Sequence, residues 1–386
     1  MLKTDFFIDK MNLHQDHDHQ LLPSGSERIW TEDLSTGELT PNECKFQDSL
    51  EGSFSSKINI YVRENRVVVA GNPSRWNRSE NLWGFRTIDE CVQVYNRVLA
   101  KLDLPPFTKA TKHWIRQGED GSKAKVVTDG AVFDHFDFTK NHAVGQGREY
   151  SFLRGLASQS IGRGLDPFLY PNGATVDWGS SKSRAVGKGS TYRYDKMYIK
   201  HIDLEQHRDK RLQFATQDQI AYYDRIAEYC RDMGIVRQEQ SKKRAFLDRN
   251  FNLRHYGFGT ESDFESHLND IDNALNRLEV NHMNYETISQ QLIANGICKS
   301  TQAANSTQAY CMSWLHGERI DKKKSQYYVH RSRLLELGLD IAVPYDVSRM
   351  PPQVRSSEVI ELRSVAPPEW YQMPTLDSRP QLRVVA

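Results

Sequence analysis

The sequence predicts an α+β fold. It comprises an antiparallel sheet with flanking helices over residues 1–275, a small helix-turn-helix-like helical domain over 276–350 and a proline-rich tail over 351–386. The first observation behind this prediction is a series of segments that alternate apolar and polar residues between short turn signals, as antiparallel strands do. The second is a pair of longer segments with apolar residues at helical spacing. The third is a change of pattern after about residue 281, where three short helical patterns each end at a glycine.

The first predicted elements are a hairpin and a helix. Residues 57–70 alternate and are rich in β-branched side chains, and Glu64-Asn65 is a plausible turn between two strands. A helix is expected to start after Thr87, because Thr87 and Glu90 have the spacing of a capping box. Pro105-Pro106 is expected to end that helix, since proline cannot continue it.

The middle of the chain is predicted to continue the sheet. Residues 126–139 have the pattern of two paired strands around the turn signal Asp129-Gly130. An amphipathic helix over 218–233 and an extended segment over 235–240 follow later. Alternation gives the second strand of the pair an aromatic face and a polar face. The aromatic face carries Phe136 and Phe138, and the polar face carries His135, Asp137 and Thr139.

The segment from Ser190 to His201 has an unusual composition. If it is a strand, alternation gives one face a row of three phenols and two ammonium groups. These belong to Tyr192, Tyr194, Lys196, Tyr198 and Lys200. A phenol can attack a phosphodiester, and neighbouring lysines favour the phenolate and hold the phosphate. On the residues alone, tyrosines that only line a half-buried strand are the commoner arrangement, and a DNA-cleaving row is the alternative.

Two carboxylates are candidates for a metal site. Asp137 lies on the polar face of its strand, and Glu239 shares a strand face with Arg237. Mg²⁺ (or Mn²⁺) binds one or two carboxylates together with phosphate oxygens, and it would polarise a scissile phosphate. The alternative is that each carboxylate is simply solvated. His17 and His19 could also bind a metal, but a mobile polar loop is the favoured interpretation there.

The glycine-rich loop over 179–189 is basic. It lacks the spacing of glycine and lysine that defines a nucleotide-binding P-loop, so a nucleotide-driven helicase is disfavoured. Lys188 in this loop is expected to contact the DNA backbone. A plain solvated loop is the alternative.

Charge and composition limit the classes of function. The net charge of +1 excludes a globally basic nucleic-acid coat, so any DNA surface must come from local clusters. The five cysteines are scattered, without the spacing of a zinc site or a disulfide framework. Neither a signal peptide nor an apolar run of membrane-spanning length is evident. We therefore expect a soluble, cytoplasmic protein with no membrane partner.

The last predicted helix, about residues 325–337, combines apolar core candidates with basic side chains. It presents His330, Arg331 and Arg333. The size and glycine punctuation of this region suit a helix-turn-helix-like module that contacts DNA phosphates. A three-helix cap with a charged outer face is an equal alternative.

Together these segments resemble the gene II/X family of phage and plasmid replication proteins. The resemblance extends over about residues 6–349 and rests on an ordered set of motifs. They are Gly71-Asn-Pro-Ser-Arg-Trp-Asn77, Asn81-Leu-Trp-Gly84, the Asp137 strand, Thr175-Val-Asp-Trp-Gly179, Lys188–His207, Val236-Arg-Gln-Glu239, Glu286-Thr-Ile-Ser and Gly296-Ile-Cys-Lys-Ser-Thr301. The sequence departs from the family pattern at His135, where an arginine is expected, and at Gln238, where an apolar residue is expected.

The resemblance implies an initiator of rolling-circle replication. Such a protein is a site-specific single-strand DNA endonuclease and strand-joining transesterase that forms a covalent 5′-phosphotyrosyl intermediate. The implied nucleophile is Tyr198, with Lys196 and Lys200 assisting it. Asp137 and Glu239 are the implied metal ligands.

The resemblance also implies contacts with DNA. Tyr192 and Tyr194 become candidates for stacking on unpaired bases, with Arg193 and His201 beside them. The implied partners are double- and single-stranded origin DNA of a phage or plasmid, and a host helicase and polymerase, in the cytoplasm of a bacterial host. The alternative function is a non-catalytic DNA-binding regulator of replication or transcription, in which the tyrosine strand is structural.

Overall fold

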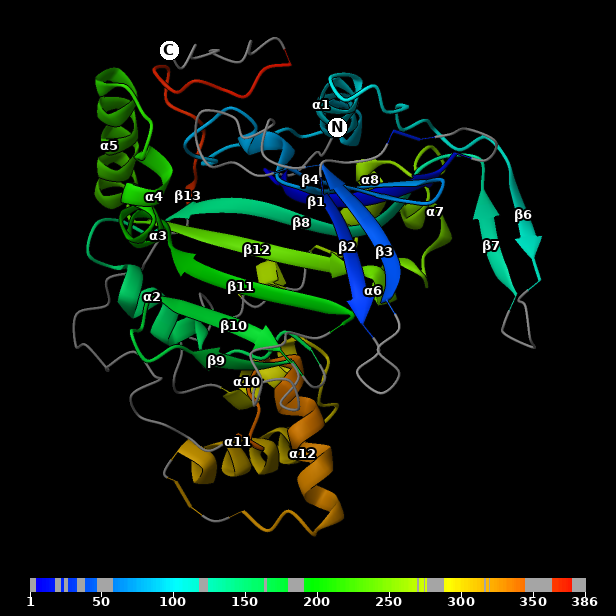
Figure 1. Cartoon of the computed structure of the whole chain (residues 1–386). Coiled ribbons are helices and arrows are strands. Elements are labelled where there is room, and N and C mark those ends of the chain that lie inside the picture. The colour runs from blue at the N-terminus through cyan, green and yellow to red at the C-terminus, as the bar shows by residue number, and fades with distance from the viewer. Residues whose placement is uncertain are drawn as a thin grey trace.

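One large antiparallel sheet organises the protein (Figure 1). The computed structural model describes residues 5–17, 22–23, 27–32, 39–46, 58–117, 124–162, 165–179, 191–268, 271–273, 275, 288–315, 317–318, 320–343 and 363–376. The strands of the sheet are β1 (Phe7–Asp16), β2 (Glu27–Glu32), β3 (Leu39–Phe46), β4 (Ile58–Arg63), β5 (Arg66–Gly71), β8 (Val132–Ala143), β9 (Asp166–Leu169), β10 (Thr175–Gly179), β11 (Arg193–Ile199), β12 (Ile235–Lys243) and β13 (Arg363–Ser364). Their order is β2-β3-β4-β5-β1-β8-β12-β11-β10-β9, and β13 pairs with β8.

Helices surround this sheet and follow it in the chain. They are η1 (Pro73–Arg75), α1 (Ile88–Ala100), α2 (Glu149–Leu156), α3 (Lys200–Gln206), α4 (Arg208–Leu212), α5 (Gln217–Asp232), α6 (Arg244–Leu247), α7 (Phe251–Arg254), α8 (Glu261–Glu265), α10 (Ile288–Ala294), α11 (Thr301–Leu315) and α12 (Ser325–Glu336). The described strand pairs are antiparallel, and helices dominate the C-terminal region. The predicted α+β fold is therefore confirmed.

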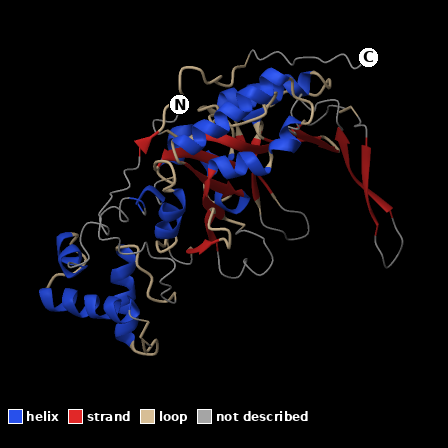
Figure 2. Ribbon diagram, turned by 90° about the vertical axis from the view of Figure 1, so that its left-hand side faces the viewer, coloured by secondary structure: helices blue, strands red, loops and turns tan. Residues whose placement is uncertain are grey.

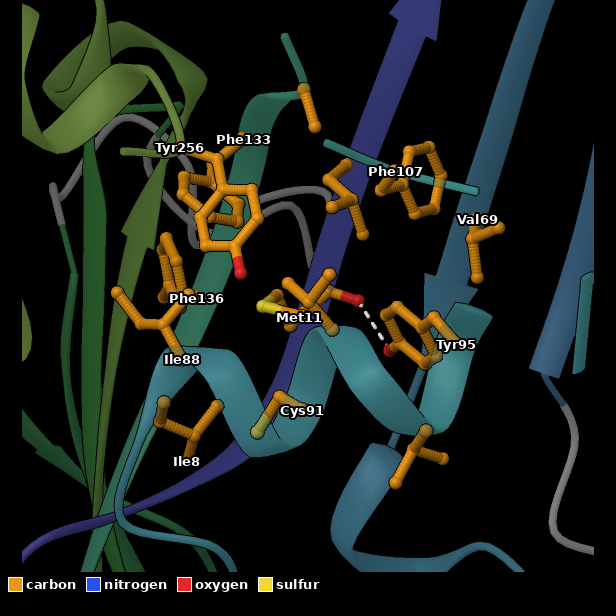
Figure 3. Close-up of a cluster of buried hydrophobic side chains, with 14 of the residues drawn as sticks. Ile8, Met11, Val69, Ile88, Cys91, Tyr95, Phe107, Phe133, Phe136 and Tyr256 are labelled. Atoms are coloured by element: carbon orange, nitrogen blue, oxygen red, sulfur yellow. Dashed lines mark hydrogen bonds between the residues drawn. The ribbon is translucent and has the colours of Figure 1, made fainter. Parts of the chain in front are cut away.

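One face of the sheet is apolar and holds the main hydrophobic core. Met11 of β1 pairs with Phe136 of β8, and Cys91 and Tyr95 of α1 belong to the same cluster (Figure 3). The Tyr95 hydroxyl donates a hydrogen bond to the Met11 carbonyl oxygen at 2.7 Å. Hydrophobic burial and this polar contact together fix α1 to β1.

The opposite face of the central strands is polar. Strand pairing sets Lys196 of β11 against Glu239 of β12, and Ser241 of β12 against Asp137 of β8. One end of the face is closed by α3 and α5, whose Leu204 and Tyr223 share a core cluster with residues of β12. Phe136 and Asp137 thus lie on opposite faces, as alternation predicts.

Several predicted elements are confirmed. β4 and β5 form the expected hairpin, and Glu64 has the positive φ of 53° that its tight turn uses. Thr87 and Glu90 form the capping box at the start of α1. α5 and β12 lie where the amphipathic and extended patterns place them.

The strand pair predicted around Asp129-Gly130 is wrong. β7 (Lys125–Thr128) pairs with β6 (His113–Arg116) in a separate ribbon, whereas β8 lies between β1 and β12 in the large sheet. The Asp129 carboxylate explains the turn signal, because it accepts hydrogen bonds from the backbone N–H groups of Thr111 and Lys112 at 2.7 and 2.9 Å. The signal therefore marks the base of the β6–β7 ribbon.

Gln238 departs from the family pattern without disturbing β12. Its side chain is fully buried, and its Oε1 lies 2.7 Å from His142 Nε2 on β8. Burial lowers the pKa of His142 to about 4, so the imidazole is neutral at pH 7. A hydrogen bond inside the protein thus satisfies the amide oxygen, and β12 is buried on both faces.

The C-terminal region consists of a helical module and a segment that returns to the sheet. α10, α11 and α12 are followed by Gly296, Gly317 and Gly338, with φ values of 69°, 70° and 80°. Residues 363–376, here called the C-terminal strap, then return to the body through β13, drawn in red in Figure 1. None of the described helices combines the length and hydropathy needed to cross a membrane.

Candidate active site

The Tyr198 phenol lies on the polar face of the sheet beside a carboxylate. Its hydroxyl donates a hydrogen bond to Glu239 Oε1 at 2.5 Å, and Lys196 Nζ lies 2.7 Å from Glu239 Oε2. The Lys196 ammonium also lies 5.0 Å from the centre of the Tyr198 ring. The fold therefore brings two residues predicted to be catalytic and one predicted metal ligand into direct contact.

A buried arginine extends this group. Arg237 is fully buried, and its guanidinium donates hydrogen bonds to the carbonyl oxygens of Asn81 and Leu82. The Asn81 side chain donates to Asp9 Oδ1 at 2.6 Å, and Asn72 donates to the same oxygen at 2.8 Å. Burial raises the pKa of Asp9, and the charge of Arg237 opposes that shift. The guanidinium therefore compensates buried acidic groups next to the tyrosine.

The sequence analysis did not assign Asp9, Asn72, Asn81 or Arg237 to the site. The two asparagines and Arg237 lie in motifs that carry the family resemblance, so a signal was present. A motif does not say what its residues touch, and these three meet only through tertiary contacts. Asp9 belongs to none of those motifs, and in the sequence it is an ordinary acidic residue in a strand.

Lys200 reaches the site from a helix. The prediction of one strand through His201 is wrong, because β11 ends at Ile199 and Lys200 begins α3. Lys200 Nζ lies 2.8 Å from Asp203 Oδ2, an i,i+3 pair of the kind that stabilises a helix. It also lies 5.7 Å from the centre of the Tyr198 ring, as a site role requires. Burial lowers the pKa of Lys200 to about 8, and the nearby charge of Arg237 adds to the effect.

The surroundings of Tyr198 favour the protonated phenol. Burial, followed by the negative charge of Glu239, raises the pKa of Tyr198 well above its ordinary value. The sequence analysis expected the opposite shift, from Lys196 and Lys200. Both lysines are ion-paired to carboxylates, with Glu239 and Asp203, and these acids offset their effect on the phenol. A proton acceptor is therefore needed before the phenol becomes a nucleophile.

Asp137 lies on the same polar face, one strand away from Glu239. Its Oδ1 accepts a hydrogen bond from Ser241 Oγ at 2.5 Å and lies 2.7 Å from His135 Nε2. Although burial acts to raise the pKa of Asp137, these hydrogen bonds hold it below its ordinary value. Asp137 is thus a carboxylate at neutral pH. Within the described residues, no three histidine, cysteine, aspartate or glutamate side chains gather closely enough to hold a metal ion.

The two tyrosines that precede Tyr198 contact other groups. The Tyr194 hydroxyl donates a hydrogen bond to Asp177 Oδ2 at 2.7 Å. The Tyr192 ring packs edge-on against Phe246 with 5.4 Å between centroids, and the Arg249 guanidinium lies 4.9 Å from its centre. Neither contact links these tyrosines to Glu239, so Tyr198 differs from them in having a carboxylate that also binds a lysine.

The neighbouring basic residues are ion-paired within the protein. Arg193 Nε donates a hydrogen bond to Asp195 Oδ2 at 2.7 Å, and His201 Nδ1 lies 3.7 Å from Glu149 Oε1. Lys188, predicted to contact the DNA backbone, lies outside the described residues.

In the helical module, Arg331 forms a two-pronged pair with Asp340. Its Nε and Nη2 atoms lie 2.6 and 2.7 Å from the two carboxylate oxygens. Arg333 Nη1 donates to Thr307 Oγ1 at 3.3 Å. Arg331 therefore joins α12 to the segment that follows it, whereas the contact of Arg333 is longer and single.

Comparison with known proteins assigns the chain to a family. Residues 292–377 match a family described as the C-terminal part of a phage-type replication-associated protein. The replication-associated protein of Escherichia phage If1 is 35% identical over 322 residues, which cover 82% of this chain and 98% of that protein. The chain belongs to this family of replication-associated proteins. The resemblance to phage replication proteins seen in the motifs is confirmed.

The match to the C-terminal family includes the strap as well as the helices. It begins within α10 and continues past β13 to the end of the described strap. Tyr371 of the strap is buried, and its hydroxyl lies 2.9 Å from Glu80 Oε2 and 3.0 Å from the backbone nitrogen of Trp83. Asn81 and Leu82, whose carbonyl oxygens bind Arg237, lie between these two residues. In this replication-associated protein the strap therefore supports the loop that holds the buried arginine.

We expect Tyr371→Phe to lower the free energy of unfolding by about 1–3 kcal/mol, because it leaves buried partners of the hydroxyl without a hydrogen bond. Urea denaturation measures the change. Tyr328→Phe is the matched control, since Tyr328 is 60% exposed and its substitution should cost less than about 0.5 kcal/mol. Equal small losses in both variants would show that the Tyr371 hydroxyl does not anchor the strap.

Proposed function

We propose that this chain is a rolling-circle replication initiator that nicks one DNA strand at an origin and later rejoins it. The observation that carries the proposal is the Tyr198 hydroxyl bound to Glu239, with three cationic side chains around the pair. The cations are Lys196, Lys200 and Arg237. Membership of a family whose relative is named a replication-associated protein supports the same function.

The proposed reaction is a transesterification at phosphorus. Glu239 takes the phenolic proton of Tyr198, and the phenolate oxygen forms a bond to the scissile phosphorus. The bond from phosphorus to the 3′ oxygen breaks, and that oxygen leaves as a hydroxyl after gaining a proton, for which Lys200 is our candidate donor. The product is a 5′-phosphotyrosyl bond, so no phosphoester bond is lost to water. Attack by a 3′-hydroxyl on this bond reverses the chemistry and rejoins the strand.

The cationic groups would stabilise the charge that develops on phosphorus. Arg237 Nη1 is buried and makes no hydrogen bond to another described residue, so it is one donor for a phosphate oxygen. Lys196 is partly exposed beside the phenol and is a second candidate. Fixed cationic donors of this kind are effective because they need little reorganisation during the reaction.

We also propose a divalent cation, Mg²⁺ or Mn²⁺, near Asp137 and Glu239. Asp137 fits this role, because it is ionised and both of its hydrogen bonds end on one oxygen, Oδ1. Glu239 fits it only after exchanging the Lys196 ammonium for the metal, since both of its oxygens are already engaged. A bound cation would polarise the scissile phosphate.

The proposed partner is origin DNA of a phage or plasmid, as duplex and as single strand. Tyr192 and Tyr194 are proposed to stack on unpaired bases, with Arg193, His201 and Lys188 contacting the backbone. Arg333 of α12 is the better candidate for phosphate contact in the helical module, because Arg331 is committed to Asp340. A host helicase and polymerase in the bacterial cytoplasm would complete the replication reaction.

The test is to incubate the chain with supercoiled DNA of the replicon that encodes it, with Mg²⁺ and, separately, with a chelator. Open circles carrying protein on the 5′ end support the proposal, and their loss in the chelator supports the metal. Bound but fully supercoiled DNA would instead indicate a non-catalytic regulator.

A further inference from the structure

A two-stranded ribbon projects from the body of the protein. β6 and β7 pair only with each other among the described strands, and both Figure 1 and Figure 2 show them extending away from the large sheet. All four residues of β6 are exposed. An isolated two-stranded ribbon gains little stability by itself, so its existence calls for a partner or a firm base.

The base of the ribbon is firmly built. Gly130 packs so closely on the backbone of Ala110 that a Cβ atom there would lie 2.3 Å from its nitrogen. The Ala110 N–H donates to the carbonyl oxygen of Tyr256, and the Thr108 N–H donates to Gln15 Oε1 at 2.8 Å. The ribbon therefore leaves the body in a fixed direction, although its far part is exposed.

The two faces of the ribbon differ. His113 is directed toward the body, where its ring packs against Phe251 and Phe258 with centroid distances of 5.3 and 5.9 Å. Alternation along β6 then places Lys112, Trp114 and Arg116 on the opposite face. This face carries a tryptophan between two cationic side chains, and the tryptophan is 42% exposed.

The ribbon is also the more basic part of a nearly neutral chain. Residues 109–128 contain five lysines and arginines and two acidic residues, whereas the whole chain has a net charge of +1. Ile115 and Val126, partners across the ribbon, are 67% and 46% exposed. Basic and apolar side chains together suit a polyanion that also offers flat apolar groups, which is the chemistry of DNA.

We propose that the β6–β7 ribbon is a second DNA-contacting element that lies in a groove of the duplex. A two-stranded β-ribbon has the width of the major groove. Lys112 and Arg116 contact phosphates on either side, and Trp114 packs against the bases or sugars between them. This inference rests on the proposed function, because its partner is the duplex in which the nick would be made. It assigns to the ribbon the grip on duplex DNA outside the cleavage site.

The test compares two ribbon variants with the wild-type chain. Trp114→Thr keeps a residue suited to a strand, and the double variant Lys112→Gln/Arg116→Gln removes two charges. The probes are a labelled linear duplex from the replicon and one of its single strands, followed by fluorescence anisotropy over a range of salt concentrations. Trp114→Thr should weaken duplex binding about ten-fold or more. The double variant should reduce the slope of log K against log salt by roughly 2.

Matched controls separate the ribbon from general surface effects. Phe214→Thr removes another aromatic side chain that is 59% exposed, and Arg208→Gln/Arg231→Gln removes two other exposed charges. These controls should retain wild-type duplex affinity. Cleavage of the isolated single strand should be unchanged in both ribbon variants, because the ribbon lies outside the Tyr198 site.

Two results would overturn the inference. One is a duplex affinity in the ribbon variants equal to that of the wild type and the controls. The other is a change from dimer to monomer in sedimentation with unchanged duplex affinity, which would make the ribbon a contact between copies of the chain. If the wild type never nicks DNA but the ribbon variants lose duplex affinity, the proposed function fails and the ribbon assignment stands.

Discussion

Tyr198→Phe is expected to abolish both nicking of the supercoiled replicon and the covalent protein–DNA product. The substitution removes the oxygen that would attack phosphorus and leaves the ring, so the fold should tolerate it. Loss of the nucleophile in a covalent mechanism removes the step itself, and we expect a decrease in the nicking rate of at least roughly a thousand-fold. Gel electrophoresis of the plasmid and recovery of 5′-labelled DNA with the protein measure the two outcomes. Duplex binding should persist.

Tyr194→Phe is the matched control for this experiment. Tyr194 lies two residues earlier on β11, and its hydroxyl is bound to Asp177 rather than to Glu239. We expect Tyr194→Phe to retain nicking. Full nicking by Tyr198→Phe would remove Tyr198 from the mechanism, and loss of nicking in Tyr194→Phe alone would move the nucleophile to that position.

Arg237→Met is expected to have the largest effect on stability, with a loss of about 3–5 kcal/mol in the free energy of unfolding. The guanidinium is fully buried and its charge interacts with Asp9 and Glu239. Methionine fills similar volume but leaves those acids uncompensated and the carbonyl oxygens of Asn81 and Leu82 without their donor. Urea denaturation followed by circular dichroism measures the loss.

Two further variants make this prediction specific. Arg244→Met removes an arginine that is 68% exposed and 3.8 Å from Asp248, and its cost should stay below about 0.5 kcal/mol. Arg237→Lys keeps the charge but has no planar fork for two carbonyl oxygens, so its cost should lie between the other two. A cost for Arg237→Met no greater than that for Arg244→Met would show that the buried charge does not hold the site together.

Local sequence patterns predicted elements that depend on neighbouring residues. The hairpin at Glu64, the capping box at Thr87 and the glycine-ended C-terminal helices are set by backbone conformation and by hydrogen bonds within a few residues. The turn at Asp129-Gly130 was misassigned because a turn signal does not say which strands it joins. The partner of β7 lies before it in the chain, and β8 is held by β1 and β12.

The candidate site was predicted in outline. Alternation placed Tyr198 with Lys196 and placed Asp137 on a polar face, because a strand repeats every two residues. It did not show that Glu239 would contact the phenol, since that depends on the pairing of β11 with β12. The direction of the pKa shift of Tyr198 was missed for the same reason, because it comes from burial and from Glu239.

The sequence by itself determined the fold class, the family resemblance and the row of tyrosines and lysines that includes Tyr198. These follow from residue order, which fixes periodicity, turns and motifs. Only the tertiary structure decided that Tyr198 meets Glu239, that Arg237 and Asp9 are buried beside it and that the β6–β7 ribbon projects into solvent. The physical reason is that burial and ion pairing depend on segments far apart in the chain, such as Asp9, Asn81 and Arg237, meeting at one point.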